Sequence, residues 1–298
     1  MAGLDVSLFE RLAAAGVKPM LLRTQYRMHG EIAKFSSTHF YRGLVRDAPS
    51  LSSTSLQRTI SFQQQNRLDV CLHPLSLIDV PIGRESRQGE EEIWGGSGPS
   101  QAADPSFGNT DEAIIAVAHA LHLLELISRG SSAQSGGTAT RGLIGIISPY
   151  KEQVRRIKNL LQRASTASAD ASNGIIVASS NLLRSVIVSS VDSFQGQELD
   201  HIIITTVRSS SSGSKFHGNS GLNQAGIGFL ADKRRLNVAV TRARLSLTLV
   251  CNADHLSRFD EDWKELIEHM KKKQNNSENN SCSSLQRYRS FTSSLLNI

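Results

Sequence analysis

The chain has 298 residues, 39% of them hydrophobic, which is enough for one large or two modest domains with a buried core. No run approaches the roughly eighteen apolar residues of a membrane-spanning helix and no secretory signal opens the chain, so we expect a soluble protein of the cytoplasm, with the nucleus as a second compartment. A net charge of +6 fits a nucleic-acid partner without requiring one, and three widely spaced cysteines suggest neither a disulfide framework nor a zinc site.

The first elements are a short helix, a strand and a polar cluster. Ser7 and Glu10 have the spacing of a capping box and predict a helix that ends near Gly16. Residues 20–22, Met-Leu-Leu, indicate a strand, and QYRMHG at residues 25–30 follows it and leads into a second helix. Because ligands bind beyond strand ends in open α/β sheets, this polar cluster with its arginine is a candidate for an active site.

A strand and a helix follow, with an acidic pair at the helix start. Residues 75–80 are apolar enough for an interior strand, and the Gly-, Ser- and Pro-rich stretch 83–108 predicts an exposed loop. Asn109 and Glu112 begin the next helix, and Asp111 and Glu112 together resemble the magnesium-binding pair of a nucleotidase. Such a pair must follow a buried strand, and this one begins a helix, so we expect no metal site there.

Three further strands surround two polar loops. The strand at 143–147 ends in SPYK, residues 148–151, and a basic helix comes next. Apolar runs at 186–188 and 202–204 flank VDSFQGQE, residues 191–198. That loop places one glycine and one carboxylate at the end of a buried strand, which is where open α/β sheets bind their ligands.

An arginine-rich helix, a strand and an amphipathic helix close the fold. Asp232 is the expected N-cap of the first helix, and residues 245–251 form the strand. Four arginines lie off the apolar face of that first helix and indicate an anionic partner: Arg234, Arg235, Arg242 and Arg244. The composition beyond residue 270 is Asn-, Ser- and Lys-rich, and residues 271–298 predict a disordered tail.

Strands and helices alternate along the chain. This order predicts an α/β fold with a doubly wound, mostly parallel sheet and helices on both faces. We expect residues 1–270 to form one domain with flexible insertions near 83–108, 131–140, 162–181 and 208–221. Insertions between elements cost little stability, so they do not argue against the fold.

Four ordered motifs resemble the second RecA-like domain of superfamily 1 helicases. They are QYRMH at 25–29, SPY at 148–150, VDSFQG at 191–196 and RLNVAVTRAR at 235–244. SLFERL at 7–12 and GIGFL at 226–230 are also similar to the up-frameshift branch, the RNA helicases of nonsense-mediated decay. The resemblance covers roughly residues 3–270 and implies the P-loop NTPase fold, in which two RecA-like domains sandwich ATP.

The resemblance implies a role for each motif in nucleotide chemistry. Arg27 and Arg242 would be arginine fingers that stabilise charge on the transferring phosphoryl group, with Arg244 as the alternative to Arg242. Tyr26 would stack on adenine. The loop would supply the other nucleotide contacts: Glu198 and Gly196 on the ribose and γ-phosphate side, and Gln195 to couple nucleotide state to the grip on nucleic acid.

A second set of residues would touch single-stranded RNA or DNA without reading its sequence. The resemblance assigns this contact to Ser148, Tyr150, Lys151, Ser190 and Asp192. Each motif alone has a simpler explanation, because a Gln-Gly pair is usually a turn and an arginine-rich helix is usually a solvated face. Their joint occurrence in family order favours the functional interpretation.

Two departures from the family pattern change the expectation. Gly30 stands where the family usually has proline, which loosens the helix start and predicts a slight shift of Arg27. The chain contains no G-x-x-x-x-G-K-[ST] loop, and no strand ends in an acidic pair for Mg²⁺. ATP and Mg²⁺ would therefore bind only together with a first RecA-like domain missing from this chain, which we expect to be a fragment, a truncated gene model or a split subunit.

Three classes of function remain to be compared. The leading interpretation is the carboxy-terminal motor domain of an ATP-dependent RNA or DNA helicase, and the alternative is a catalytically inactive RecA-like module that binds nucleic acid or a protein. A phosphate loop encoded upstream in frame would favour the helicase. A self-sufficient nucleotidase or nuclease is disfavoured because the phosphate loop and the metal carboxylates are missing.

Overall fold

The computed structural model describes seven stretches of the chain, namely residues 6–51, 73–87, 106–131, 143–167, 183, 185–209 and 227–275. Most of each predicted insertion, and the part of the predicted tail beyond residue 275, lie outside these stretches. The description below concerns the seven stretches alone.

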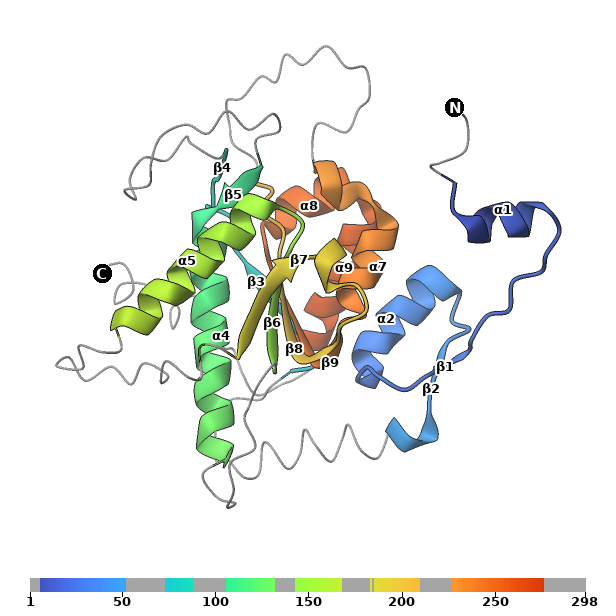
Figure 1. Ribbon diagram of the computed structural model, residues 1–298, viewed down its shortest axis with the longest axis horizontal. Coiled ribbons are helices and arrows are strands. Elements are labelled where there is room, and N and C mark those ends of the chain that lie inside the picture. The colour runs from blue at the N-terminus through green and yellow to red at the C-terminus, as the bar shows by residue number, and fades with distance from the viewer. Residues whose placement is uncertain are drawn as a thin grey trace, which may run out of the picture.

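Five strands form one parallel sheet in the spatial order β3-β9-β8-β6-β7. They are β3 (Leu75–Asp79), β6 (Ile144–Ser148), β7 (Val186–Ser190), β8 (Leu199–Thr205) and β9 (Ala243–Cys251). Each lies where an apolar run predicts a strand, because strands buried on both faces are apolar along most of their length. The sheet confirms the predicted α/β architecture (Figure 1).

Helices cover both faces of the sheet. The core on one face includes side chains of α2 (Gly30–Tyr41), α7 (Lys233–Val240), α8 (Ala253–Phe259) and α9 (Glu261–Asn275), and the core on the other face those of α4 (Thr110–Ser131) and α5 (Lys151–Ala167). Successive strand residues point to opposite faces, so Ile202 and Ile204 join the first core and Ile203 the second. No helix in the described stretches is long and apolar enough to cross a membrane.

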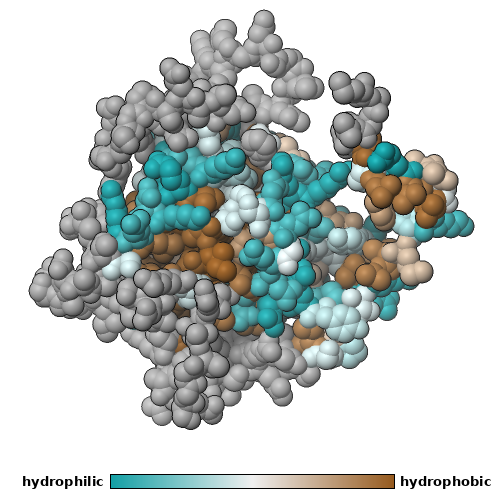
Figure 2. All heavy atoms as spheres, in the orientation of Figure 1, coloured by the Kyte–Doolittle hydropathy of each residue, from teal (hydrophilic) through white to brown (hydrophobic). Residues whose placement is uncertain are grey.

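The N-terminal elements follow the prediction only in part. The capping box of Ser7 and Glu10 is present at the start of α1 (Leu8–Ala14). The strand predicted at residues 20–22 is wrong: the strand is β1 (Thr24–Gln25), which pairs with β2 (Arg46–Asp47). Met20 is 89% exposed, and residues 20–22 pair with no strand in the described stretches. Figure 2 shows that hydrophobic side chains of α1 are likewise uncovered.

Several elements extend into segments predicted to be irregular. A hairpin of β4 (Glu85–Arg87) and β5 (Phe107–Asn109) forms at the two ends of the predicted loop 83–108. Helix α5 continues to Ala167, inside the predicted insertion 162–181, and α9 continues to Asn275, past the predicted domain boundary at residue 270. Helix α8 was not predicted. These differences lengthen the fold without changing its topology.

The connection between β7 and β8 crosses the face of the sheet. Since β6, β7 and β8 are parallel, residues 191–198 must return from the carboxyl end of β7 to the amino end of β8. A short 3₁₀ helix, η3 (Asp192–Phe194), lies in this loop, and Phe194 is fully buried beneath it. Gly145 of β6 makes room for that ring, because a Cβ there would lie 3.0 Å from Phe194 Cζ.

Glu112 fixes the chain where it leaves β8. Its amide nitrogen donates to Asn109 Oδ1 at 3.1 Å, which confirms Asn109 as a cap of α4. Its Oε2 accepts the amides of Thr206 and Val207 at 2.9 and 2.8 Å, and Val207 adopts a left-handed φ of 71°. Complete burial raises the pKa of Glu112 to about 8, although the two backbone donors oppose that shift.

We predict a distinctive pH dependence of stability from Glu112. An unfolded glutamate loses its proton near pH 4.5 and the folded carboxyl near pH 8, so between these values the folded state binds more protons. The group's stabilising contribution is therefore complete below about pH 4.5 and falls as pH rises toward 8. Glu112→Gln keeps an acceptor oxygen and cannot ionise. Relative to the parent chain, we expect the free energy of unfolding of the variant to gain roughly 3 kcal/mol from pH 5 to pH 8, on top of a constant cost for placing an amide at the buried Oε1 position, which has no hydrogen-bond partner among the described residues.

Urea unfolding at pH 5, 6.5 and 8 measures this gain. The matched control is Asp111→Asn, which neutralises the exposed neighbouring carboxylate and should give a pH profile parallel to that of the parent chain. A Glu112→Gln profile that is also parallel to the parent's would contradict the buried, protonated carboxyl.

Candidate functional site

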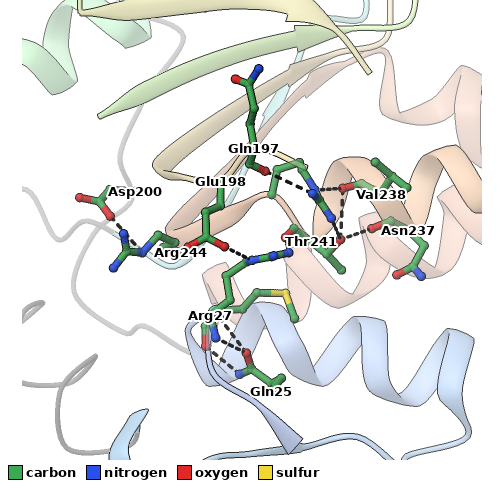
Figure 3. A network of polar contacts seen from close by, with 11 residues as sticks. Gln25, Arg27, Gln197, Glu198, Asp200, Asn237, Val238, Thr241 and Arg244 are labelled. Atoms are coloured by element: carbon green, nitrogen blue, oxygen red, sulfur yellow. Dashed lines mark hydrogen bonds and ion pairs between the residues drawn. The ribbon is translucent and has the colours of Figure 1, made fainter. Parts of the chain in front are cut away.

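The predicted nucleotide residues meet at the amino ends of two central strands. Glu198 directly precedes β8, and Arg242 directly precedes β9. The loop 191–198 leaves the carboxyl end of β7, as predicted, and crosses the sheet before β8 begins, so that Glu198 lies at the opposite edge. Arg27 comes to the same place from the turn between β1 and α2 (Figure 3).

Arg27 is held by acceptors from two other segments. Its Nε donates to the carboxylate of Glu198, and its Nη1 donates to the carbonyl oxygen of Thr241 at 3.1 Å. Gln25 shapes the turn, because its Oε1 accepts the amides of Arg27 and Met28, each at 2.8 Å. The resulting ion pair is partly exposed, with side-chain exposures of 35% for Arg27 and 41% for Glu198.

A backbone contact ties this turn to the sheet. The amide of His29 donates to the carbonyl oxygen of Arg244 in β9 at 2.7 Å. His29 Nδ1 also accepts the amide of Glu31 at 3.2 Å and caps α2. The side chain of Arg244 is 39% exposed and pairs with Asp200 at 3.5 Å. The turn that carries Arg27 is therefore anchored on both sides.

Arg242 is the buried member of the cluster. Its three nitrogens donate to Val238 O at 2.9 Å, Gln197 O at 3.2 Å and Thr241 Oγ1 at 3.1 Å. Burial lowers the pKa of Arg242 and the charge of Arg27 lowers it further, whereas Glu198 raises it. The hydrogen bonds of Arg242 therefore join the end of α7 to the loop before β8. The cluster of Arg27, Arg242 and Glu198 holds two positive charges beside one carboxylate.

Three other predicted nucleotide residues are accessible. Tyr26 is 72% exposed, next to Arg27 in the same turn. Gln195 is exposed, and Gly196 has a left-handed φ of 88° with open space where a Cβ would lie. Glycine is therefore needed at 196 for its backbone conformation rather than for close packing. An exposed aromatic ring and two guanidinium groups can accommodate a base and an anionic phosphate chain.

The residues predicted to touch nucleic acid lie at the carboxyl ends of β6 and β7. Lys151 is exposed at the start of α5. Ser190 Oγ lies 2.9 Å from Ser193 Oγ, and Asp192 accepts Nε and Nη2 of Arg235 at 3.0 and 3.3 Å. This edge therefore offers a lysine, hydroxyls and an exposed ion pair for backbone contacts.

Ser148 and Tyr150 are buried and do not reach that surface. The Tyr150 hydroxyl donates to Ile227 O at 3.2 Å, just before η4 (Gly228–Ala231), and its ring packs edge-on against Phe107. Ser148 is fully buried, and its Oγ accepts the Tyr150 amide at 3.4 Å. In this structure both side chains support the edge from within the core, whereas Lys151 is exposed.

Sequence reasoning missed the partners that orient the arginines. Arg27 donates to the Glu198 carboxylate and to the Thr241 carbonyl, both distant in the chain. Arg242 donates to the carbonyl of Gln197, which lies in another segment. No spacing rule connects Arg27 with residue 198. The described stretches hold no group of three or more His, Cys, Asp or Glu side chains placed to bind a metal ion.

Comparison with known proteins places this arrangement in a family. A family model described as an AAA domain matches residues 4–254. "Regulator of nonsense transcripts 1" is 36% identical over 272 residues in Dictyostelium discoideum and 35% identical over 275 residues in Caenorhabditis elegans, covering 91% and 92% of this chain. "ATP-dependent helicase NAM7" of Saccharomyces cerevisiae is 31% identical over 272 residues, or 91% of the chain.

The chain spans only part of each relative. The matched region is 16% of the Dictyostelium protein, 21% of the Caenorhabditis protein and 22% of the yeast helicase. The family model covers all five strands of the parallel sheet. The chain therefore belongs to the AAA domain family, in the up-frameshift-like branch of the superfamily 1 helicases.

Proposed function

We propose that this chain is the carboxy-terminal motor domain of an ATP-dependent superfamily 1 helicase that translocates on single-stranded RNA or DNA in the cytoplasm. The observation that carries the proposal is the cluster of Arg27, Glu198 and Arg242, assembled from three distant segments beside an exposed tyrosine. The name of the yeast relative supports ATP-driven helicase activity. The names of the Dictyostelium and Caenorhabditis relatives support a place in nonsense-mediated decay.

In the proposed enzyme Arg27 and Arg242 stabilise charge on the transferring phosphoryl group. Arg27 is the more accessible of the two, while Arg242 must exchange some of its carbonyl partners to reach a phosphate. Tyr26 stacks on adenine, and Gln195 and Gly196 lie beside the nucleotide. A first RecA-like domain holds ATP and Mg²⁺, which neutralises the phosphates when bound.

The same loop links the nucleotide to the nucleic acid. Ser190 and Asp192 lie at its start on the carboxyl edge, and Glu198 lies at its end on the amino side. Lys151, Ser190 and Asp192 contact the sugar-phosphate backbone, without reading sequence. A shift of the loop at the carboxyl edge then also moves Glu198, the partner of Arg27, at the amino edge.

A catalytically inactive RecA-like module is the second candidate. Arginine fingers accelerate hydrolysis only where a lysine and Mg²⁺ hold the phosphates, and residues 1–298 themselves contain no G-x-x-x-x-G-K-[ST] loop. Such a module binds nucleic acid or a protein and turns over nothing, alone or with a first domain.

The first test measures ATP hydrolysis by this chain alone and joined to the phosphate-loop domain of a relative. We expect no turnover above background from the chain alone, and turnover in the joined protein. In the latter, Arg27→Ala and Arg242→Ala should each lower kcat by about a thousandfold or more, the scale of an arginine finger, with little change in nucleic-acid affinity without nucleotide. Absence of turnover in the joined protein would favour the inactive module.

The control is Arg155→Ala. Arg155 is 55% exposed and donates to Glu152, which keeps Arg156 as a second partner, so turnover should be nearly unchanged. Urea unfolding of Arg242→Ala separates lost chemistry from lost stability, because this buried side chain makes three hydrogen bonds. Normal kcat in Arg242→Ala with collapse in Arg244→Ala would transfer the role to Arg244.

The second test concerns nucleic acid. We expect the chain alone to bind single-stranded RNA or DNA weakly, with an affinity that falls as salt rises, because its contacts are to phosphates. Fluorescence anisotropy at several salt concentrations measures this, and Lys151→Ala should weaken binding and reduce the salt slope by about one. Tight, sequence-selective or salt-insensitive binding would contradict the assignment.

A further inference from the structure

The strand β5 and the residue before it lie along the start of α5 (Figure 1). Residues 106–109 lie against this part of the chain one after another, in the pairs Ser106–Glu152, Phe107–Tyr150, Gly108–Arg156 and Asn109–Gln153. Lys151 is the first residue of α5, and its neighbours Tyr150 and Glu152 both belong to these pairs. The position of this exposed lysine therefore depends on the position of β5.

Arg156 extends this contact across the hairpin of β4 and β5. Its Nε donates to Glu152 within α5, its Nη1 to Thr110 Oγ1 of α4 and its Nη2 to Ser86 Oγ of β4, each at 2.9 Å. The side chain of Arg156 is 11% exposed and that of Glu152 only 1%. Three acceptors fix the orientation of a planar guanidinium, because its nitrogens cannot move independently. Arg156 thereby fastens α5 to both α4 and the hairpin.

Gly108 gives the guanidinium group its path to the hairpin. Ser86 and Gly108 lie opposite each other in the register of β4 and β5, so Arg156 passes over the glycine to reach the serine. A Cβ at position 108 would lie 2.5 Å from Nε and 2.8 Å from Cζ of Arg156. Glycine weakens a strand, and inside one it often marks the close approach of another group. Here that group is the guanidinium of Arg156.

We propose that Arg156 is a positioning residue for nucleic-acid binding, which holds Lys151 at the carboxyl edge by fastening α5 to the hairpin. The inference rests on the proposed function for the ligand, the sugar-phosphate backbone, but not for the contacts. Arg156 is almost buried and its three hydrogen bonds go to protein acceptors, so it acts through Lys151 and not on a phosphate. Without Arg156, Glu152 still accepts from Arg155 at 2.6 Å, which leaves this buried carboxylate paired.

Fluorescence anisotropy of single-stranded RNA with the chain alone tests the role of Arg156. We expect Lys151→Ala and Arg156→Ala each to weaken binding roughly three- to tenfold, the range of one charged contact. Because both changes affect the same contact, the double variant should bind no more than about twofold more weakly than Lys151→Ala. Arg156→Lys keeps the charge but cannot place donors on three acceptors at fixed angles, so it should bind as weakly as Arg156→Ala.

Gly108→Ala perturbs the same contact without a change of charge. The added methyl group displaces the guanidinium of Arg156, so we expect RNA binding to weaken roughly three- to tenfold in the parent chain. In the Arg156→Ala background nothing remains to be displaced, and the same substitution should change the affinity by less than about twofold. Urea unfolding verifies that each variant is folded, and Gly108→Ala carries the test if Arg156→Ala does not fold.

The matched control is Arg155→Ala. It removes an equal charge from the same helix and from the same carboxylate. The Arg155 side chain is 55% exposed, and among the described residues it donates to Glu152 alone. Its removal should therefore leave RNA affinity unchanged within about twofold.

The outcomes separate this inference from the proposed function. Additive losses in Lys151→Ala and Arg156→Ala, with binding retained in Arg156→Lys, would mean that Arg156 contacts phosphate itself and would overturn the inference. Full affinity in a folded Arg156→Ala or Gly108→Ala variant would also overturn it, while the loss in Lys151→Ala would still support the proposed function. Full affinity in Lys151→Ala would refute both the inference and the proposed contact of Lys151 with nucleic acid.

Discussion

The constraint on which the structure depends is the parallel direction of β7 and β8. A chain that leaves the carboxyl end of one strand must return to the amino end of the other, and here only residues 191–198 make that crossing. Phe194, fully buried above Gly145, fastens the crossing to the sheet. The loop 191–198 consequently has its first residues at the carboxyl edge of the sheet and its last residues at the amino edge. A single short segment therefore connects the two edges directly.

The arginine cluster depends on that crossing. Arg242 donates to the carbonyl of Gln197 and Arg27 to the carboxylate of Glu198, so the last two residues of the loop hold both guanidinium groups. Two guanidinium groups in close contact repel each other. A fixed carboxylate and backbone carbonyls offset this repulsion without having to reorient, as water molecules must. The cluster is thus organised by the protein's own groups, which is the preorganisation that the proposed arginine fingers would need.

The sequence predicts the elements better than their surroundings. Apolar runs such as residues 202–204 form strands because burial on both faces leaves a clear pattern, while the equally apolar residues 20–22 pair with no strand in the described part of the chain. Motif order predicted that Arg27 and Arg242 share a site, and the structure brings them together, but the edge on which they lie follows from strand direction, which composition does not encode. The burial of Tyr150 depends on Ile227, 77 residues away.

Gly30 illustrates how distant contacts compensate for a local departure. We expected the glycine to loosen the start of α2 and displace Arg27. The shift of Arg27 stays a prediction, whereas the start of α2 is held in place: His29 caps the helix, and Gln25 binds both the turn and Asp47, whose carboxylate oxygen would lie 2.7 Å from a Cβ at position 30. The absence of a side chain admits Asp47 beside the helix start, where a negative charge is favourable. In this structure Arg27 is oriented by the acceptors around it, the Glu198 carboxylate and the Thr241 carbonyl.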